Sequence, residues 1–162
     1  MKKSVYIETS VFSYLAARPS RNLVAAALQQ VTAEWWERHR GRFAVFVSEL
    51  VIAEARQGSA EAAAKRLDLI KTVPELEVTE RVVELAKRLV ESDALPKSAL
   101  GDAMHIALAA VHGVDYLLTW NYRHIDNAER KPVVRSVCAV AGHQCPEICT
   151  PQELMGDEDN GG

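Results

Sequence analysis

The sequence lacks long hydrophobic runs, has few cysteines and shows no excess of positive charge. No stretch of 18 apolar residues occurs, so we expect no membrane-spanning helix. No apolar leader segment follows Met1, and the three cysteines are an odd number, so we expect reduced thiols in a cytoplasmic protein. The 19 Lys and Arg stand against 22 Asp and Glu, which gives a net charge of −3. This balance excludes a protein that coats nucleic acid non-specifically, so any nucleic-acid contact must come from a local patch.

The composition that is present is that of an ordinary globular domain. Apolar residues make up 48% and charged residues 25% of the 162 residues, with 8 Gly and 6 Pro. These values exclude fibrous and disordered classes, and a chain of this length can bury a substantial core. No internal repeat or linker divides the sequence. We therefore expect one domain over residues 1–155 and an acidic, glycine-rich, disordered tail over residues 156–162.

Short apolar runs alternate with helical patterns along the chain. Cap residues and apolar spacing predict helices over 23–39, 48–57, 59–70, 79–92, 99–112 and 132–141, and strands over 5–7, 43–47, 116–118 and 146–149. Residues 75–78 are ambiguous, and Thr150 to Glu153 form a capping-box pattern. This alternation predicts an α/β domain with a short parallel sheet flanked by helices.

Acidic and polar residues occur at the positions where such a sheet binds its ligands, beyond the carboxyl ends of the strands. Glu8 directly follows the first predicted strand, and Asn121 follows the strand over 116–118. Glu54 lies in the helix after the second strand, and Asp102 lies in the first turn of the helix over 99–112. Carboxylates gathered in one cleft repel one another unless a cation neutralises them, and oxygen ligands suit Mg²⁺ or Mn²⁺. A cation held in this way can drive displacement at phosphorus.

Each of these residues also has a simpler interpretation. Glu8 can be a solvated loop residue, and Asp102 can favour its helix dipole without any metal. Glu54 can be a surface acid that pairs with Arg56 or Lys65, and Asn121 can be a turn residue.

Four segments carry a family resemblance. They are Tyr6–Leu15 (YIETSVFSYL), Ser48–Glu54 (SELVIAE), Gly101–Ala110 (GDAMHIALAA) and Tyr116–Asn121 (YLLTWN). In this order they resemble the PIN-domain family, and most of all the VapC-like toxins of bacterial toxin–antitoxin pairs. The resemblance covers about residues 4–154. It implies a three-layer fold and an Mg²⁺- or Mn²⁺-dependent endoribonuclease whose partners are an RNA substrate, a cognate antitoxin protein and a second copy in a homodimer.

The resemblance also implies roles for individual residues. Glu8, Glu54 and Asp102 match the acidic metal ligands and, together with Asn121, the catalytic positions. Thr9, Ser10 and Thr119 match the supporting polar residues.

The sequence departs from the family pattern at Glu8, where Asp is usual, and at Asn121, where an acid is common. Asparagine accepts hydrogen bonds but brings no charge. One alternative is therefore a degenerate PIN domain that binds nucleic acid or a protein without cutting, and another is a small-molecule phosphotransfer domain. Because Glu8→Gln keeps the shape of the side chain and relieves repulsion between like charges, the sequence predicts that it leaves stability unchanged or raises it.

A few further residues are candidates for ligand contacts. His105, Arg123 and His124 can contact RNA phosphates, although a local helix contact for His105 and a solvated loop for the other two are the simpler interpretations. The spacing of Cys138, His143, Cys145 and Cys149 lacks paired zinc-knuckle cysteines, so buried thiols are favoured over a zinc site.

Overall fold

The computed structural model describes residues 1–156, which form five parallel strands and seven α-helices among the described residues. The sheet has the order β3-β2-β1-β4-β5. Its strands are β1 (Ser4–Ile7), β2 (Ala44–Ser48), β3 (Glu75–Leu76), β4 (Tyr116–Leu118) and β5 (Glu147–Cys149). The helices are α1 (Thr9–Ala16), α2 (Leu23–Glu34), α3 (Glu49–Ala55), α4 (Ala60–Ile70), α5 (Glu80–Glu91), α6 (Leu100–Val111) and α7 (Lys131–Val140).

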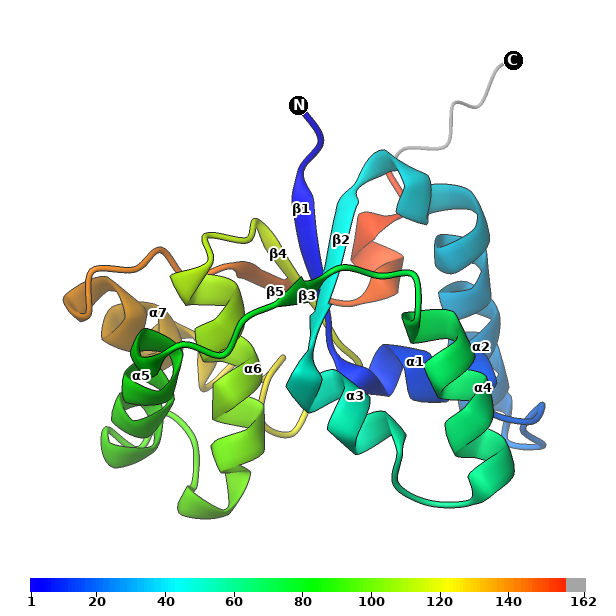
Figure 1. Cartoon of the computed structure of the whole chain (residues 1–162), viewed down its shortest axis with the longest axis horizontal. Helices are drawn as coiled ribbons and strands as arrows, with labels where there is room; N and C mark the ends of the chain where they lie inside the picture. The colour runs from blue at the N-terminus through cyan, green and yellow to red at the C-terminus, as the bar shows by residue number, and fades with distance from the viewer. Residues whose placement is uncertain (157–162) are drawn as a thin grey trace.

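Helices cover both faces of the sheet, as Figure 1 shows. Helices α5, α6 and α7 lie on one side, and α1 to α4 lie on the other. The closest helix pair is α5 with α6, and α1 packs against α2, α3 and α4. The predicted α/β architecture with a parallel sheet flanked by helices is therefore confirmed.

Strand β1 is the centre of the sheet and of the core. It pairs with β2 on one side and with β4 on the other, and Val5, Tyr6 and Ile7 are all fully buried. A strand that is buried on both faces reads as a continuous apolar run, which explains why this short segment was recognisable in the sequence.

Most helix starts agree with the predicted caps. The side chains of Asn22, Ser59 and Thr79 accept hydrogen bonds from backbone amides in the first turns of α2, α4 and α5. Ser48 precedes α3 but makes no side-chain cap, because its hydroxyl bonds to the Tyr6 hydroxyl instead.

Three elements differ from the sequence prediction. Helix α1 was not predicted, and the single long helix over 23–39 is α2 followed by a π-helical turn at Trp35–His39. The ambiguous segment over 75–78 contributes the short edge strand β3. The predicted tail lies, apart from Gly156, outside the described residues. Within residues 1–156, none of the helices has both the length and the apolarity needed to span a membrane.

Candidate active site

The sheet order changes direction at β1, so the carboxyl ends of β1 and β4 flank a switch point, the place where open α/β sheets form a crevice. From β1 the chain moves to β2 and β3 on one side, and then to β4 and β5 on the other. Ligands bind open α/β sheets at such a switch point. Glu8 follows β1 and Thr119 follows β4 at this point, and the Glu8 amide donates to the Leu118 carbonyl at 3.0 Å.

Glu8 is held by three donors. Its Oε1 accepts hydrogen bonds from the hydroxyls of Ser10 at 2.5 Å and Thr119 at 2.6 Å, and its Oε2 accepts from the Ser10 amide at 3.1 Å. The last bond makes Glu8 the N-cap of α1. The two hydroxyls in turn accept from backbone amides, Ser10 from Trp120 and Thr119 from Asn121. Glu8 is therefore a buried carboxylate, only 5% exposed, that ties β1, α1 and the end of β4 together.

Glu54 belongs to a second chain of hydrogen bonds. Its Oε1 lies 2.5 Å from His105 Nε2 and accepts from the Thr9 hydroxyl at 3.1 Å. The other ring nitrogen of His105, Nδ1, lies 2.7 Å from the Tyr6 hydroxyl. With Glu54 ionised, Nε2 carries the proton toward the carboxylate, and Nδ1 can accept from the tyrosine. The fully buried His105 therefore fixes the position of Glu54 from below the crevice.

The electrostatics of this chain follow from burial and these bonds. Burial raises the pKa of the Tyr6 hydroxyl, so Tyr6 stays a neutral donor. Burial also acts to raise the pKa of Glu54, but the hydrogen bonds from His105 and Thr9 outweigh it and leave that pKa below its ordinary value. Glu54 is therefore a carboxylate at neutral pH.

Asp102 is the third acid, in the first turn of α6. Its Oδ2 lies 2.9 Å from Nδ1 of His124. The backbone amide of His124 donates to Asn121 Oδ1 at 3.1 Å, so Asn121 sets the position of the loop that carries the histidine. The chain of contacts from Thr119 through Asn121 and His124 thus reaches from Glu8 to Asp102.

The comparison with protein families fits this arrangement. Residues 5–130, more than half of the chain, match the family described as PIN domain. The chain therefore belongs to the PIN domain family. A comparison with curated proteins finds no significant match. PIN domains are generally nucleases, that is, hydrolases, and are typically dependent on divalent metal ions.

The acids of this PIN domain fit a hard cation by donor type, but they do not form a ready-made cage. Within residues 1–156, no three His, Cys, Asp or Glu side chains come together as a metal-binding group. Oε2 of Glu54 and Oδ1 of Asp102 have no hydrogen-bond partner among the described residues, and these side chains are 34% and 22% exposed. Exposed carboxylate oxygens without a protein partner are the ligands that Mg²⁺ and Mn²⁺ take. Both oxygens of Glu8, in contrast, are already bonded.

The structure also places the other predicted residues. Thr9, Ser10 and Thr119 each bond to an acid of the site. Arg123 is exposed, and together with His124 it lines a cavity of about 590 Å³ beside Asp102. His105 is fully buried with both ring nitrogens engaged, so the expectation that it contacts RNA is replaced by a positioning contact to Glu54. Tyr6 and Ser48, which complete the chain behind His105, were not predicted, because no sequence pattern marks these contacts.

The alternative zinc site has no support in the described residues. All three cysteines are free thiols, and Cys138 and Cys149 are buried. The burial of these two thiols agrees with the favoured interpretation, while Cys145 is only partly buried.

Proposed function

We propose that the chain is a metal-dependent endoribonuclease that hydrolyses an RNA phosphodiester. The observation that carries the proposal is the position of Glu8, Glu54 and Asp102 near the switch point of the sheet. One chain of hydrogen bonds links Glu8 to Asp102, and Glu54 lies in a second chain that includes Thr9, the residue after Glu8. Mg²⁺ or Mn²⁺ at such a site polarises a scissile phosphate and lowers the pKa of an attacking water.

The residues of the chain have distinct parts in this proposal. Glu54 and Asp102 supply the accessible carboxylate oxygens, and His105 and His124 hold these two acids in place. Glu8 contributes its negative charge, and its Oε2, which accepts a single hydrogen bond, keeps a second lone pair for a ligand. Asn121 orders the loop through the His124 amide.

The cavity beside Asp102 is the proposed place for the RNA strand. It is lined on one side by Arg123, His124 and Asn127, and on the other by Pro96 and Ser98. The exposed Arg123 guanidinium has no hydrogen-bond or ion-pair partner among residues 1–156, so it is available for a bidentate contact to a phosphate.

The toxin role and the partners are part of the same proposal. We propose that a small antitoxin neutralises the chain by covering the acidic crevice, and that the protein acts in the cytoplasm with reduced cysteines. We also propose a homodimer. Trp35 is buried, and Trp36 is partly buried with the Arg40 guanidinium 3.8 Å from its ring centroid, so neither tryptophan offers a free surface to a second copy. The exposed Leu23 and Val24 of α2 are better candidates for a contact with a second copy.

The test is cleavage of a labelled RNA with and without Mg²⁺ or Mn²⁺. We expect metal-dependent cleavage by the wild type and a loss of about a hundredfold or more in Asp102→Asn, because charge stabilisation at phosphorus is lost. The matched control is Asp68→Asn, which removes an exposed acid that pairs only with Lys71. Cleavage by Asp102→Asn at the rate of Asp68→Asn would contradict the assigned site.

Asn121 favours a second candidate, a degenerate domain that binds without cutting. The Asn121 Oδ1 accepts a hydrogen bond from the His124 amide, and an aspartate oxygen can accept the same bond. Asn121→Asp therefore adds a charge without breaking a contact that the structure shows. If the wild type cleaves no RNA in either metal while Asn121→Asp does, the degenerate interpretation replaces the nuclease proposal.

A further inference from the structure

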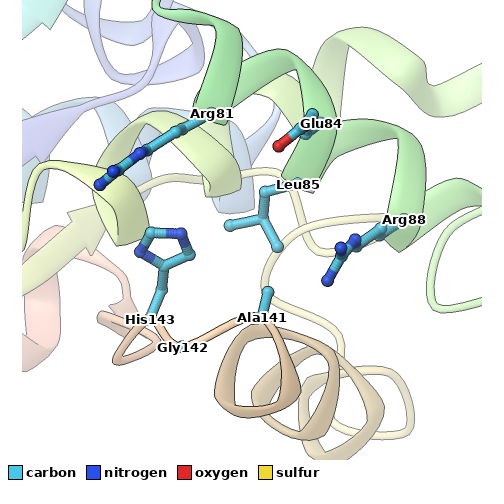
Figure 2. Close-up of a pocket in the computed structure, with 7 residues that line it drawn as sticks. All are labelled: Arg81, Glu84, Leu85, Arg88, Ala141, Gly142 and His143. Atoms are coloured by element: carbon cyan, nitrogen blue, oxygen red, sulfur yellow. The ribbon is translucent and has the colours of Figure 1, made fainter.

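A small pocket lies between α5 and the end of α7, away from the acidic crevice. Its volume is about 240 Å³, and Figure 2 shows the side chains around it. Arg81 and Arg88 extend from α5 on either side of Leu85, while Ala141 and His143 face them from the end of α7 and the loop that follows. Gly142 and Glu84 complete the lining.

The Arg81 end of the pocket lies away from the acids. The ring of His112, just after the end of α6, contacts the Glu77 carbonyl before the start of α5, whereas Asp102 lies in the first turn of α6. Arg81 at the start of α5 therefore lies at the far end of α6 from Asp102. His143 precedes β5, on the amino side of the sheet. The pocket and the candidate active site share no residue.

The two arginines of the pocket are available to a ligand. Neither guanidinium has a hydrogen-bond or ion-pair partner among residues 1–156, and both side chains are exposed. The two positions are seven residues apart, so they span about 10 Å along one face of α5. A guanidinium that faces a concave, partly enclosed space is suited to bidentate binding of a phosphate or to stacking on an aromatic ring.

The arrangement of the lining residues suits a ligand that carries more groups than a simple anion. At one end, Arg81 and His143 offer donors to a phosphate. In the middle, Glu84 offers a carboxylate, which accepts hydrogen bonds from sugar hydroxyls and repels a second phosphate. At the other end, Arg88 adjoins an apolar surface formed by Val137 and Val140, where a flat ring can lie.

We propose that this pocket binds a nucleoside 5′-phosphate. The phosphate lies between Arg81 and His143, the ribose hydroxyls face Glu84, and the base stacks on Arg88 above Leu85. The volume limits the occupant to one nucleotide. That nucleotide is either a free mononucleotide or the 5′-phosphorylated end of an RNA. The inference is independent of catalysis at the acidic crevice.

The experiment is calorimetric titration of the full chain carrying Asp102→Asn, so that no substrate is consumed. The probes are adenosine 5′-monophosphate, adenosine, orthophosphate and an RNA trinucleotide with a 5′-phosphate or a 5′-hydroxyl. We expect the monophosphate to bind at least about tenfold more tightly than adenosine or orthophosphate, which corresponds to about 1.4 kcal/mol. We expect Arg81→Gln and Arg88→Gln each to weaken this binding by about tenfold or more, because charge-assisted bonds or stacking are lost.

The matched control is Lys87→Gln, which removes an exposed charge from α5 outside the pocket. We expect it to bind the monophosphate within twofold of the parent, and unchanged urea midpoints in all variants would show that they fold. If the trinucleotide binds more tightly than the monophosphate, and only with its 5′-phosphate, the pocket is assigned to RNA ends. If the monophosphate binds more tightly than the trinucleotide, the pocket is assigned to a free mononucleotide. Equal weakening by Lys87→Gln, equal affinity for adenosine, or binding that does not depend on the 5′-phosphate would overturn the proposal.

Discussion

Replacing Glu8 with glutamine tests the hydrogen-bond network at the centre of the fold. The carboxylate accepts three hydrogen bonds, two from hydroxyls and one from the amide that begins α1. Glutamine has one acceptor oxygen and one NH₂ group, so the three bonds cannot all be kept. Either the Ser10 amide faces the NH₂ group, or the two hydroxyls accept from that group and lose their own acceptor. The substitution therefore does more than remove a charge.

The expected loss of unfolding free energy follows from the number of hydrogen bonds that the substitution weakens. Hydrogen bonds to charged groups contribute about 1.5–3 kcal/mol and those between neutral groups about 0.5–1.5 kcal/mol. Weakening three bonds by about 1 kcal/mol each costs about 3 kcal/mol, and relief of repulsion from the neighbouring acids offsets part of this. We expect a net loss of about 2 kcal/mol, which reverses the expectation from the sequence that stability stays constant or rises.

The assay is urea unfolding followed by far-ultraviolet circular dichroism. With a slope of about 2 kcal/mol/M, the midpoint should fall by about 1 M. Glu77→Gln is the control, because this exposed side chain has no hydrogen-bond partner among residues 1–156. Thr119→Val should cost less in the Glu8→Gln background than in the wild type, since the two changes remove the same bond. A midpoint for Glu8→Gln at or above the wild-type value would refute the reasoning.

Three further predictions follow from other contacts. The backbone and side-chain bonds from Ser4 and the charge of Lys3 hold the pKa of Asp115 below its ordinary value of 3.8. The ionised carboxylate therefore stabilises the fold at pH values above 3.8, and this contribution is lost as the pH falls through the lowered pKa. The difference in melting temperature between wild type and Asp115→Asn should then disappear in acid. A bond from the Cys138 thiol lowers the pKa of Cys145, whereas burial raises that of Cys149 to about 12. Iodoacetamide at neutral pH should then label Cys145 first, and mass spectrometry showing Cys149 first would contradict this. Finally, chelation by EDTA should abolish RNA cleavage and leave the melting temperature unchanged, because each acid has its own protein donor.

The fold was largely predictable because its signals are local. The apolar run at Val5 to Ile7 identifies a strand that is buried on both faces, and the caps at Asn22, Ser59 and Thr79 mark helix starts. Helix α1 was not predicted because its local signals are weak. This helix has eight residues, contains Val11, Phe12 and Tyr14, and is capped by Glu8, which is not among the preferred capping residues.

The positions of the acids were predictable, but their partners were not. Glu8 and Asn121 follow strands, so the topology of a parallel sheet brings them to one edge. His105 reaches Tyr6 from 99 residues away and Glu54 from 51 residues away. No spacing in the sequence encodes such contacts, because they depend on how α6 and α3 pack beside β1.

The partners change the argument for why the acids can stay together. The sequence alone predicts that neighbouring carboxylates require a cation to neutralise them. In the structure, hydroxyls and an amide hold Glu8, a buried imidazole holds Glu54, and a partly exposed imidazole holds Asp102. These protein donors offset part of the repulsion among the acids, and the outward oxygens of Glu54 and Asp102 remain open to a cation. Asn121 keeps the acceptor oxygen that orders the His124 loop but carries no negative charge. The missing charge lowers the repulsion around Asp102, and it also removes one possible metal ligand.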